Sequence, residues 1–270
     1  MWYHISDWNA VYDNAPNIPK GADWPGVWAE PAAAFRAAAR AELDIPYGPG
    51  AREVFDLFRP EGAARGLVVF VHGGFWMGLD KSFFSHLAAG ALAHGHAVAI
   101  PSYTLAPEAR IAAMTQQIGA AVAAAAARVP GPIRLTGHSA GGHLVTRMVC
   151  VDSPLPPDLR ARIAGVLSLS GLHDLRPLRH IWRNATLRID EAEAVAESPA
   201  LNTPLPHTRL TAWAGAMETS EFLRQNALLP NIWAGLGATT RVVVEPNRHH
   251  FNIVDGLGQP DHPLVAALLD

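Results

Sequence analysis

The sequence contains a single cysteine, Cys150, in 270 residues. One cysteine excludes an intrachain disulfide and any metal site built from several cysteines. Cys150 falls in an apolar stretch that we expect to be helical, so we predict a buried and unreactive thiol. The histidines are scattered and do not pair at metal-ligand spacing, and we therefore expect no metal site.

Charge is also scarce, since Asp, Glu, Lys and Arg make up 17% of the chain and the net charge is −3. Without a basic run, nucleic acid is a poor candidate partner. No apolar run reaches the roughly 18 residues that a membrane span requires. The first residues, Met1 to Asp7, lack the basic and apolar segments of a secretory signal, and we expect a cytoplasmic protein.

Apolar residues are plentiful at 49%, which predicts a large core. The length fits one α/β domain over residues 1–270. Residues 1–45 form an expected N-terminal arm and helix with Trp2, Trp8, Trp24 and Trp28. We favour a surface arm that covers the sheet, and the alternative is a wall of the substrate pocket. Residues 176–208, rich in Arg, Pro and Ala, are expected to form a small cap.

Strands and helices are expected to alternate along the chain. Apolar runs typical of buried strands lie at 54–58, 66–71, 97–100, 133–136, 166–170, 210–214 and 241–244. Helices are expected at 31–43, 83–94, 109–129, from 142, at 221–236 and from 263. This alternation predicts a mostly parallel central sheet with helices on both faces.

The stretch Gly137-His138-Ser139-Ala140-Gly141 follows one of these strands and precedes a helix. G-x-S-x-G in that setting is the nucleophile elbow of the α/β-hydrolase fold. The sharp turn exposes the Ser139 hydroxyl, and the flanking glycines let strand and helix approach closely. Ser139 is therefore the predicted nucleophile.

A serine nucleophile needs a base and a group that orients the base, and in this fold the order is Ser, acid, His. Glu218 stands in the turn after the strand at 210–214, and His250 follows the strand at 241–244. We prefer Glu218 to Glu221, which falls inside the next helix. We also prefer His250 to His249, since only one of the two is expected to face Ser139.

An oxyanion hole requires backbone N–H groups close to the serine hydroxyl. Ala140, the residue after the nucleophile, supplies one of them. The glycine-rich loop after the strand at 66–71 is expected to supply the others, from Gly74 and Phe75. An ordinary strand-to-helix turn is the alternative interpretation of this loop.

The loop His72-Gly73-Gly74-Phe75-Trp76 resembles the HGGxW motif of kynurenine formamidases, which are relatives of the hormone-sensitive-lipase-like esterases. Further stretches share the resemblance, which covers most of the chain from about residue 45: 47–50, 56–60, 102–108, 137–142, 170–177, 220–225 and 250–251. Tyr12-Asp13-Asn14 faintly resembles an N-terminal family motif, which would bring the arm towards the site.

The resemblance implies hydrolysis of an aryl formamide, N-formyl-L-kynurenine, to L-kynurenine and formate, without a cofactor. It assigns Ser139 as nucleophile, His250 as base and Glu218 as acid, although aspartate is commoner than glutamate at that last position. Trp76 is a candidate to stack on an aromatic substrate or to pack behind the loop. Asp174 is a candidate for contact with a substrate amino group, or for shaping a turn.

Two other functions compete with this one. A carboxylesterase for small acyl or aryl esters would use the same machinery, and the walls of the pocket decide between the two substrates. A non-catalytic binding protein would be expected to have a broken triad, which the sequence does not show. The expected partner is a small-molecule substrate, and the oligomeric state stays open, with a homodimer as one option.

Overall fold

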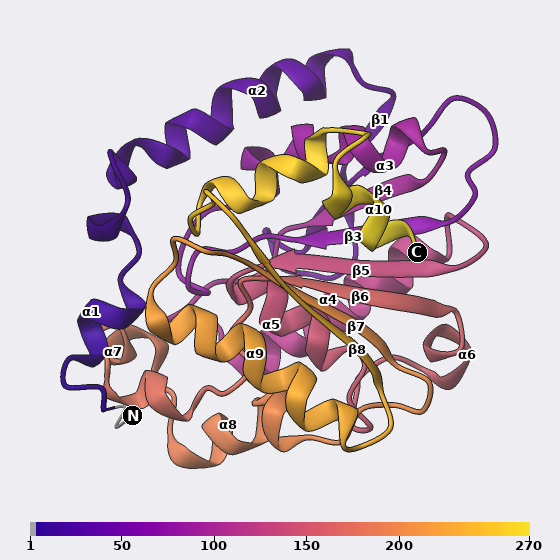
Figure 1. The fold of residues 1–270 in the computed structure, drawn as a ribbon. Helices are drawn as coiled ribbons and strands as arrows, with labels where there is room; N and C mark the ends of the chain where they lie inside the picture. Colours follow the sequence, from indigo (N-terminus) through magenta and orange to yellow (C-terminus); the bar gives the residue numbers. More distant parts are fainter. Residues whose placement is uncertain (1–3) are drawn as a thin grey trace.

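The computed structural model describes residues 4–270, so Trp2 of the expected arm lies outside the described residues. At its centre is one sheet of eight strands (Figure 1). The strands are β1 (Ala41–Pro46), β2 (Val54–Phe58), β3 (Leu67–Val71), β4 (Ala97–Pro101), β5 (Ile133–His138), β6 (Ile163–Leu169), β7 (Arg209–Gly215) and β8 (Thr239–Glu245).

The strand order is β1-β2-β4-β3-β5-β6-β7-β8. β2 pairs antiparallel with both β1 and β4, and all pairs from β4 to β8 are parallel. The carboxyl ends of β3, β5, β7 and β8 therefore meet at one edge of the sheet. The residues that follow these four strands, where the sequence predicts the functional groups, are brought together there.

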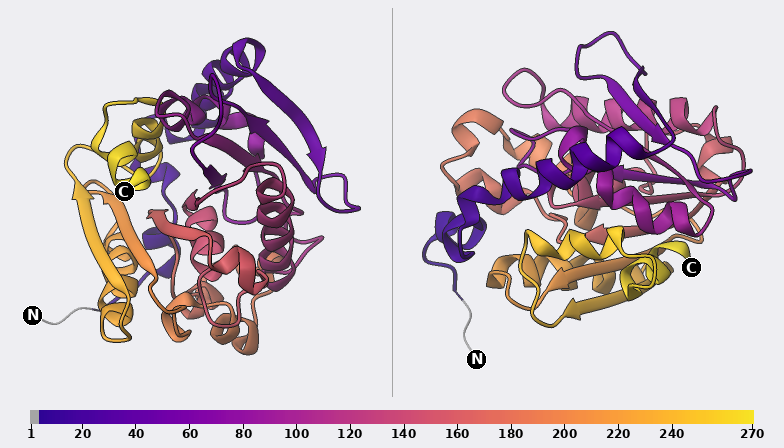
Figure 2. Two further views of the ribbon diagram at one scale, coloured as in Figure 1. Left: turned by 90° about the vertical axis from the view of Figure 1, so that its right-hand side faces the viewer. Right: turned by 90° about the horizontal axis from the view of Figure 1, so that it is seen from above.

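Alternation along the buried strands divides the core between the two faces of the sheet. In β3, Leu67, Val69 and Val71 pack on one face, whereas Val68 and Phe70 pack on the other. Successive side chains of a strand point to opposite faces, so a continuous apolar run is what a sheet covered on both sides requires. Helices cover both faces of the twisted sheet, as the views in Figures 1 and 2 show.

The α-helices are α1 (Trp8–Tyr12), α2 (Trp24–Ala38), α3 (Ala89–Ala93), α4 (Ile111–Ala126), α5 (Ala140–Arg147), α6 (Pro157–Arg160), α7 (Asn184–Leu187), α8 (Glu191–Ala196), α9 (Ser220–Ala234) and α10 (Pro263–Leu269). α4, α5 and α9 contribute to one core cluster, and α2, α3 and α10 contribute to the other. The predicted fold class, a mostly parallel sheet between helices, is confirmed.

Three elements differ clearly from the sequence prediction. α2 begins at Trp24, not at Pro31, because Pro25 occupies its first turn and Pro31 is accommodated inside the helix. β1 was not expected, since this edge strand is largely exposed and lacks an apolar run. The helix expected at 83–94 is replaced by short 3₁₀ turns and α3, which begins only at Ala89.

The N-terminal arm packs against residues 176–208. The Trp8 and His180 rings stack 5.8 Å apart, and the backbone N–H of Trp182 donates to Oδ1 of Asn9 at 2.7 Å. α1 accordingly lies beside the turn Arg176–His180 of this segment, as can be followed in Figure 1. That residues 176–208 act as a cap stays a prediction.

Among residues 4–270, no helix combines the length and the apolar character that crossing a membrane requires. The cytoplasmic location remains a prediction. Cys150 is fully buried, and burial raises the pKa of its thiol to about 12. The thiol is therefore protonated at neutral pH, which agrees with the expectation of an unreactive group.

Candidate active site

Ser139 occupies the turn between β5 and α5, with backbone angles φ 54° and ψ −115°. Few non-glycine residues adopt such a conformation, and the surrounding contacts hold it in place. The Ser139 N–H donates to the carbonyl of Leu169, at 2.8 Å, and its own carbonyl accepts from His143 at 3.1 Å. α5 begins at Ala140, directly after the serine and two residues earlier than expected, so the serine lies at the helix N-terminus.

Small residues around this turn are required by close contacts. A Cβ on Gly141 would clash with the carbonyl of Val71, and one on Gly137 would clash with the carbonyl of Gly141. A Cβ on Gly73 would come within 3.1 Å of the Ser139 Cβ and 2.9 Å of the His138 carbonyl oxygen. The glycine-rich loop therefore lies directly against Ser139, which an ordinary turn would not require.

Glu218 and His250 meet as the sequence predicts. Nδ1 of His250 lies 2.7 Å from Oε2 of Glu218, and both side chains are buried. The other carboxylate oxygen, Oε1, accepts from the Ser170 hydroxyl at 2.6 Å and from the Gly215 N–H at 2.7 Å. The carboxylate is thus fixed on both sides, and it orients the imidazole of His250.

The two alternatives lie elsewhere. Glu221 points away and accepts from the Tyr12 hydroxyl and from Arg224. The His249 ring packs edge-on against Trp24 at 5.1 Å, and its Nδ1 accepts from the backbone N–H of Phe251. The structure therefore pairs Glu218 with His250, in agreement with the preferred residues.

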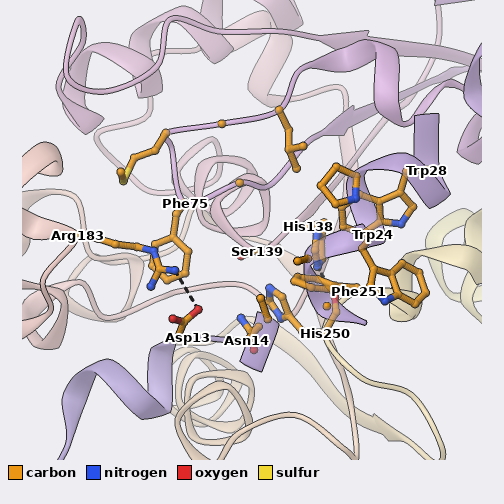
Figure 3. Close-up of a pocket in the computed structure, with 18 residues that line it drawn as sticks. Asp13, Asn14, Trp24, Trp28, Phe75, His138, Ser139, Arg183, His250 and Phe251 are labelled. Carbon is orange, nitrogen blue, oxygen red and sulfur yellow. Dashed lines mark hydrogen bonds and ion pairs between the residues drawn. The ribbon is translucent and has the colours of Figure 1, made fainter. Parts of the chain in front are cut away.

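Ser139 and His250 line the same cavity, which has a volume of about 380 Å³. Figure 3 shows His138, Ser139 and His250 between two walls: Trp24, Trp28 and Phe251 on one side, and Phe75 with Arg183 on the other. Within residues 4–270 no hydrogen bond joins the Ser139 hydroxyl to His250. In enzymes without bound substrate this bond is often long, and it tightens in the complex.

The loop after β3 contributes Gly74 and Phe75 to the cavity wall. Phe75 has a φ of 53°, and Gly74 has a φ of 108°. Across residues 4–270, no acceptor takes the backbone N–H groups of these two residues. The N–H of Ala140 opens α5, where the first N–H groups have no partner within the helix.

His72 packs against the glycine-rich loop from the core side. Its ring is fully buried, stacks 4.5 Å from Tyr103, and lies with Nδ1 2.7 Å from the carbonyl oxygen of Gly73. Burial lowers the pKa of His72 to about 4, so the ring is neutral at pH 7. A neutral imidazole with an Nδ1–H can donate to the Gly73 carbonyl and hold the loop in place.

Two candidate substrate contacts fall outside the cavity. Trp76 is fully buried and packs edge-on against His143 at 5.3 Å, so it supports the loop instead of facing the cavity. Asp174 is buried and forms an ion pair with Arg176 at 2.9 Å. This local pairing explains its position without a substrate. These positions fit the alternative interpretations, in which Trp76 packs behind the loop and Asp174 shapes a turn.

The N-terminal arm forms much of the cavity wall, through Asp13, Asn14, Trp24 and Trp28. This corrects our preference for an arm that only covers the sheet, although Trp28 also packs in the core. The tryptophans of the arm, for which a pocket wall was the alternative interpretation, and the resemblance at Tyr12-Asp13-Asn14 were the sequence signals for this arrangement.

His138 and Arg183 also line the cavity, and neither was among the predicted site residues. Nε2 of His138 lies 2.8 Å from the backbone oxygen of His250, and the two rings are 4.7 Å apart. Burial holds the pKa of His138 well below its usual value, so its ring is neutral and can donate to that oxygen. The position of His138 in the elbow sequence was a signal that it would lie near the site. Arg183 had no such signal.

Over the part of the chain that the structure describes, no group of three or more His, Cys, Asp or Glu residues could hold a metal ion.

Comparison with known proteins gives consistent results. A family model described as the α/β hydrolase fold matches residues 68–225. A kynurenine formamidase of Salmo salar is 28% identical over 87% of this chain and 83% of its own length. One of Danio rerio is 26% identical over 84% of this chain and 80% of its own length.

Solved structures extend the comparison. A putative thioesterase from a Silicibacter species is 45% identical and superimposes with a TM-score of 0.93, covering 98% of this chain and 99% of that chain. An esterase of Pyrobaculum calidifontis, 16% identical with a TM-score of 0.71, covers 92% of this chain and 90% of that chain. At that identity the second likeness concerns the fold alone.

Proposed function

We propose, from the premise that this chain belongs to the α/β-hydrolase fold family, that it is a serine hydrolase that cleaves an aryl formamide through an acyl-enzyme. Ser139 is the nucleophile, His250 the general base and Glu218 the acid that orients it. The observation that carries the proposal is the 2.7 Å contact between Glu218 and His250 at the cavity that Ser139 lines.

The reaction follows from these positions. Nε2 of His250 takes the Ser139 proton as the hydroxyl oxygen attacks the formyl carbon. The N–H groups of Gly74, Phe75 and Ala140 stabilise the negative charge on the carbonyl oxygen, and the loss of one such donor typically costs about 3 kcal/mol. His250 then donates the proton to the departing aryl amine. A water molecule, deprotonated by His250, attacks the formyl carbon of the formyl-serine. The bond from this carbon to the Ser139 oxygen breaks, His250 returns the proton to that oxygen, and formate leaves.

The substrate is proposed from the relatives and from the cavity walls. The two fish relatives are named kynurenine formamidases, and the proposed substrate is N-formyl-L-kynurenine, which gives L-kynurenine and formate. Trp24, Trp28 and Phe251 offer aromatic surface on one wall, on which an aryl ring can pack. No step of this chemistry requires a cofactor.

The first experiment tests the nucleophile. Ser139→Ala should abolish formation of L-kynurenine, measured by its near-ultraviolet absorbance, and should abolish labelling by a fluorophosphonate. Turnover retained by folded Ser139→Ala protein would refute the assignment. Absence of labelling and of hydrolysis in the wild type would favour a non-catalytic binding protein.

Ester or thioester cleavage is the second candidate function. It is favoured by the 45% identical relative, whose structure is described as that of a putative thioesterase. The values of kcat/KM for N-formyl-L-kynurenine and p-nitrophenyl acetate decide between the candidates. Brisk ester cleavage without release of kynurenine would assign the chain to the esterases.

The proposed partner is a small-molecule substrate. Sedimentation velocity of the purified chain would decide between a monomer and a homodimer.

A further inference from the structure

Two residues with opposite formal charges, Asp13 and Arg183, lie side by side on the cavity wall. Nη2 of Arg183 donates to Oδ1 of Asp13 at 3.0 Å, and the two side chains are 17% and 28% exposed. Figure 3 shows this pair beside Phe75, across the cavity from Trp24 and Trp28. Histidines aside, the other described residues of the cavity wall carry no formal charge.

The guanidinium of Arg183 is only partly satisfied. Its Nη1 is buried, and no residue from 4 to 270 provides it with a hydrogen-bond partner. The group is held in place by the rings of Phe75 and Trp182, whose centroids lie 4.8 Å and 4.5 Å from the guanidinium carbon. A buried donor without a partner is costly, and a planar guanidinium is well suited to a carboxylate.

A simple anion would not suit this position. A carboxylate bound at Arg183 would lie close to the carboxylate of Asp13, because the Arg183 guanidinium is already hydrogen-bonded to Asp13. The like charges would repel each other unless the ligand also carried a cation close to its carboxylate. An α-amino acid meets this condition, because its ammonium and carboxylate are attached to the same carbon.

We propose that Arg183 and Asp13 bind the α-amino-acid end of the substrate, with its carboxylate on Arg183 and its ammonium on Asp13. This inference rests on the proposed function and names the residues that determine its specificity. Arg183 packs on Phe75, whose N–H is a proposed oxyanion donor. Binding of the charged end is therefore linked to the loop that faces the scissile bond.

The alternative is that the pair only fastens the arm to residues 176–208, and substrate discrimination separates the two roles. N-formyl-L-kynurenine is compared with N-formyl-2-aminoacetophenone, which has the same aryl formamide but no amino-acid end. Arg183→Met should lower the ratio of the two kcat/KM values roughly 10- to 100-fold, mainly through KM. Arg183→Lys should recover part of that ratio, because it restores the charge without the planar fork.

Asp13→Asn tests the other half of the pair. Asp13→Asn lacks the negative charge that would bind the substrate ammonium. It should therefore lose its preference for N-formyl-L-kynurenine over a second analogue, which keeps the carboxylate of N-formyl-L-kynurenine but lacks its α-amino group. The ratio of the two kcat/KM values should fall about tenfold. An equal loss on all substrates, or unchanged ratios in both variants, would show that the pair is only structural.

A measurement on the wild type covers the case in which the variants do not fold. L-kynurenine should inhibit hydrolysis of p-nitrophenyl acetate at least about tenfold more tightly than 2-aminoacetophenone does. Equal inhibition would overturn the inference while leaving the serine hydrolase intact. An enzyme that cleaves neither formamide would instead overturn the proposed function, and its reaction with a fluorophosphonate would then separate an esterase from a non-catalytic protein.

Discussion

The hydroxyl of Ser170 donates a hydrogen bond of 2.6 Å to Oε1 of Glu218, whose other oxygen faces His250. Ser170 is buried and has a φ of 51°, so it reaches the carboxylate from an uncommon backbone conformation. The Gly215 N–H is the second donor to the same oxygen. Ser170 therefore acts as a positioning residue for the proposed acid.

Ser170→Ala should lower kcat about tenfold, because one of two donors to a charged oxygen is lost while the other remains. KM should change little, since Ser170 does not line the cavity. Steady-state kinetics at several pH values would measure both parameters. Ser153→Ala is the matched control, because Ser153 is also buried and bonded, to the Leu155 N–H at 3.2 Å, but lies away from the site. Unchanged kcat in Ser170→Ala would count against this role.

A second prediction concerns the contact between the glycine-rich loop and Ser139, the proposed nucleophile. Gly73→Ala places a methyl group within 3.1 Å of the Ser139 Cβ and 2.9 Å of the His138 carbonyl oxygen. The loop must move to relieve this contact, and the proposed oxyanion donors, Gly74 and Phe75, move with it. We expect kcat/KM to fall at least about 100-fold, in line with the loss of one oxyanion donor.

Gly26→Ala is the control for that substitution. Gly26 lies in α2, and an added Cβ would have no neighbour within 4 Å. The control should retain activity and gain slightly in stability, because alanine favours the helix. Circular dichroism confirms that both variants fold, and comparable activity of the two would contradict the predicted contact.

The positions of Ser139, Glu218 and His250 could be predicted because each lies just after a strand of a parallel sheet. Once the strands were found as apolar runs, the carboxyl ends of β5, β7 and β8 had to share an edge. The choice between Glu218 and Glu221 also followed from local structure, since Glu221 falls inside α9.

The cavity wall could not be predicted in this way, because it depends on contacts between distant segments. The Tyr12 hydroxyl donates to Oε1 of Glu221 across 209 positions of sequence, at 2.6 Å. Nothing in the local pattern around either residue indicates this contact. The ion pair between Arg183 and Asp13 could not be predicted either, because the two residues are 170 positions apart and share no sequence motif.

The hydrogen bond between Tyr12 and Glu221 gives a third prediction. Tyr12→Phe removes the hydroxyl that ties the arm to α9, and it should lower the free energy of unfolding by about 1–2 kcal/mol. KM should rise as well, because Asp13 and Asn14 follow directly and line the cavity. Urea unfolding and steady-state kinetics would measure the two effects.

Tyr47→Phe is the control for Tyr12→Phe. Its hydroxyl donates to the Ser102 carbonyl, also at 2.6 Å, at a place outside the cavity. It should lose similar stability without a change in KM. A parallel rise of KM in both variants would show that the effect is not specific to the arm.

The last prediction concerns buried histidines and pH. His143 and His173 are fully buried, and burial lowers their pKa values to about 3 and about 4. In the unfolded chain a histidine has a pKa of about 6.5. Between these values the unfolded state binds protons that the folded state does not. Stability is therefore full above pH ~6.5 and is lost as the pH falls towards the folded pKa values.

Each of these two histidines should make the free energy of unfolding about 2 kcal/mol lower at pH 5 than at pH 7. That is a large part of the stability of a typical domain. His173→Gln removes one of these groups together with its bonds to Ser168 and Gln225. The variant should be less stable than the wild type at pH 7. Its further loss between pH 7 and pH 5, measured by urea unfolding, should be smaller by about 2 kcal/mol, because one fewer proton is taken up on unfolding. If both proteins lose the same free energy over that interval, His173 is protonated in the folded state and its burial does not act as argued.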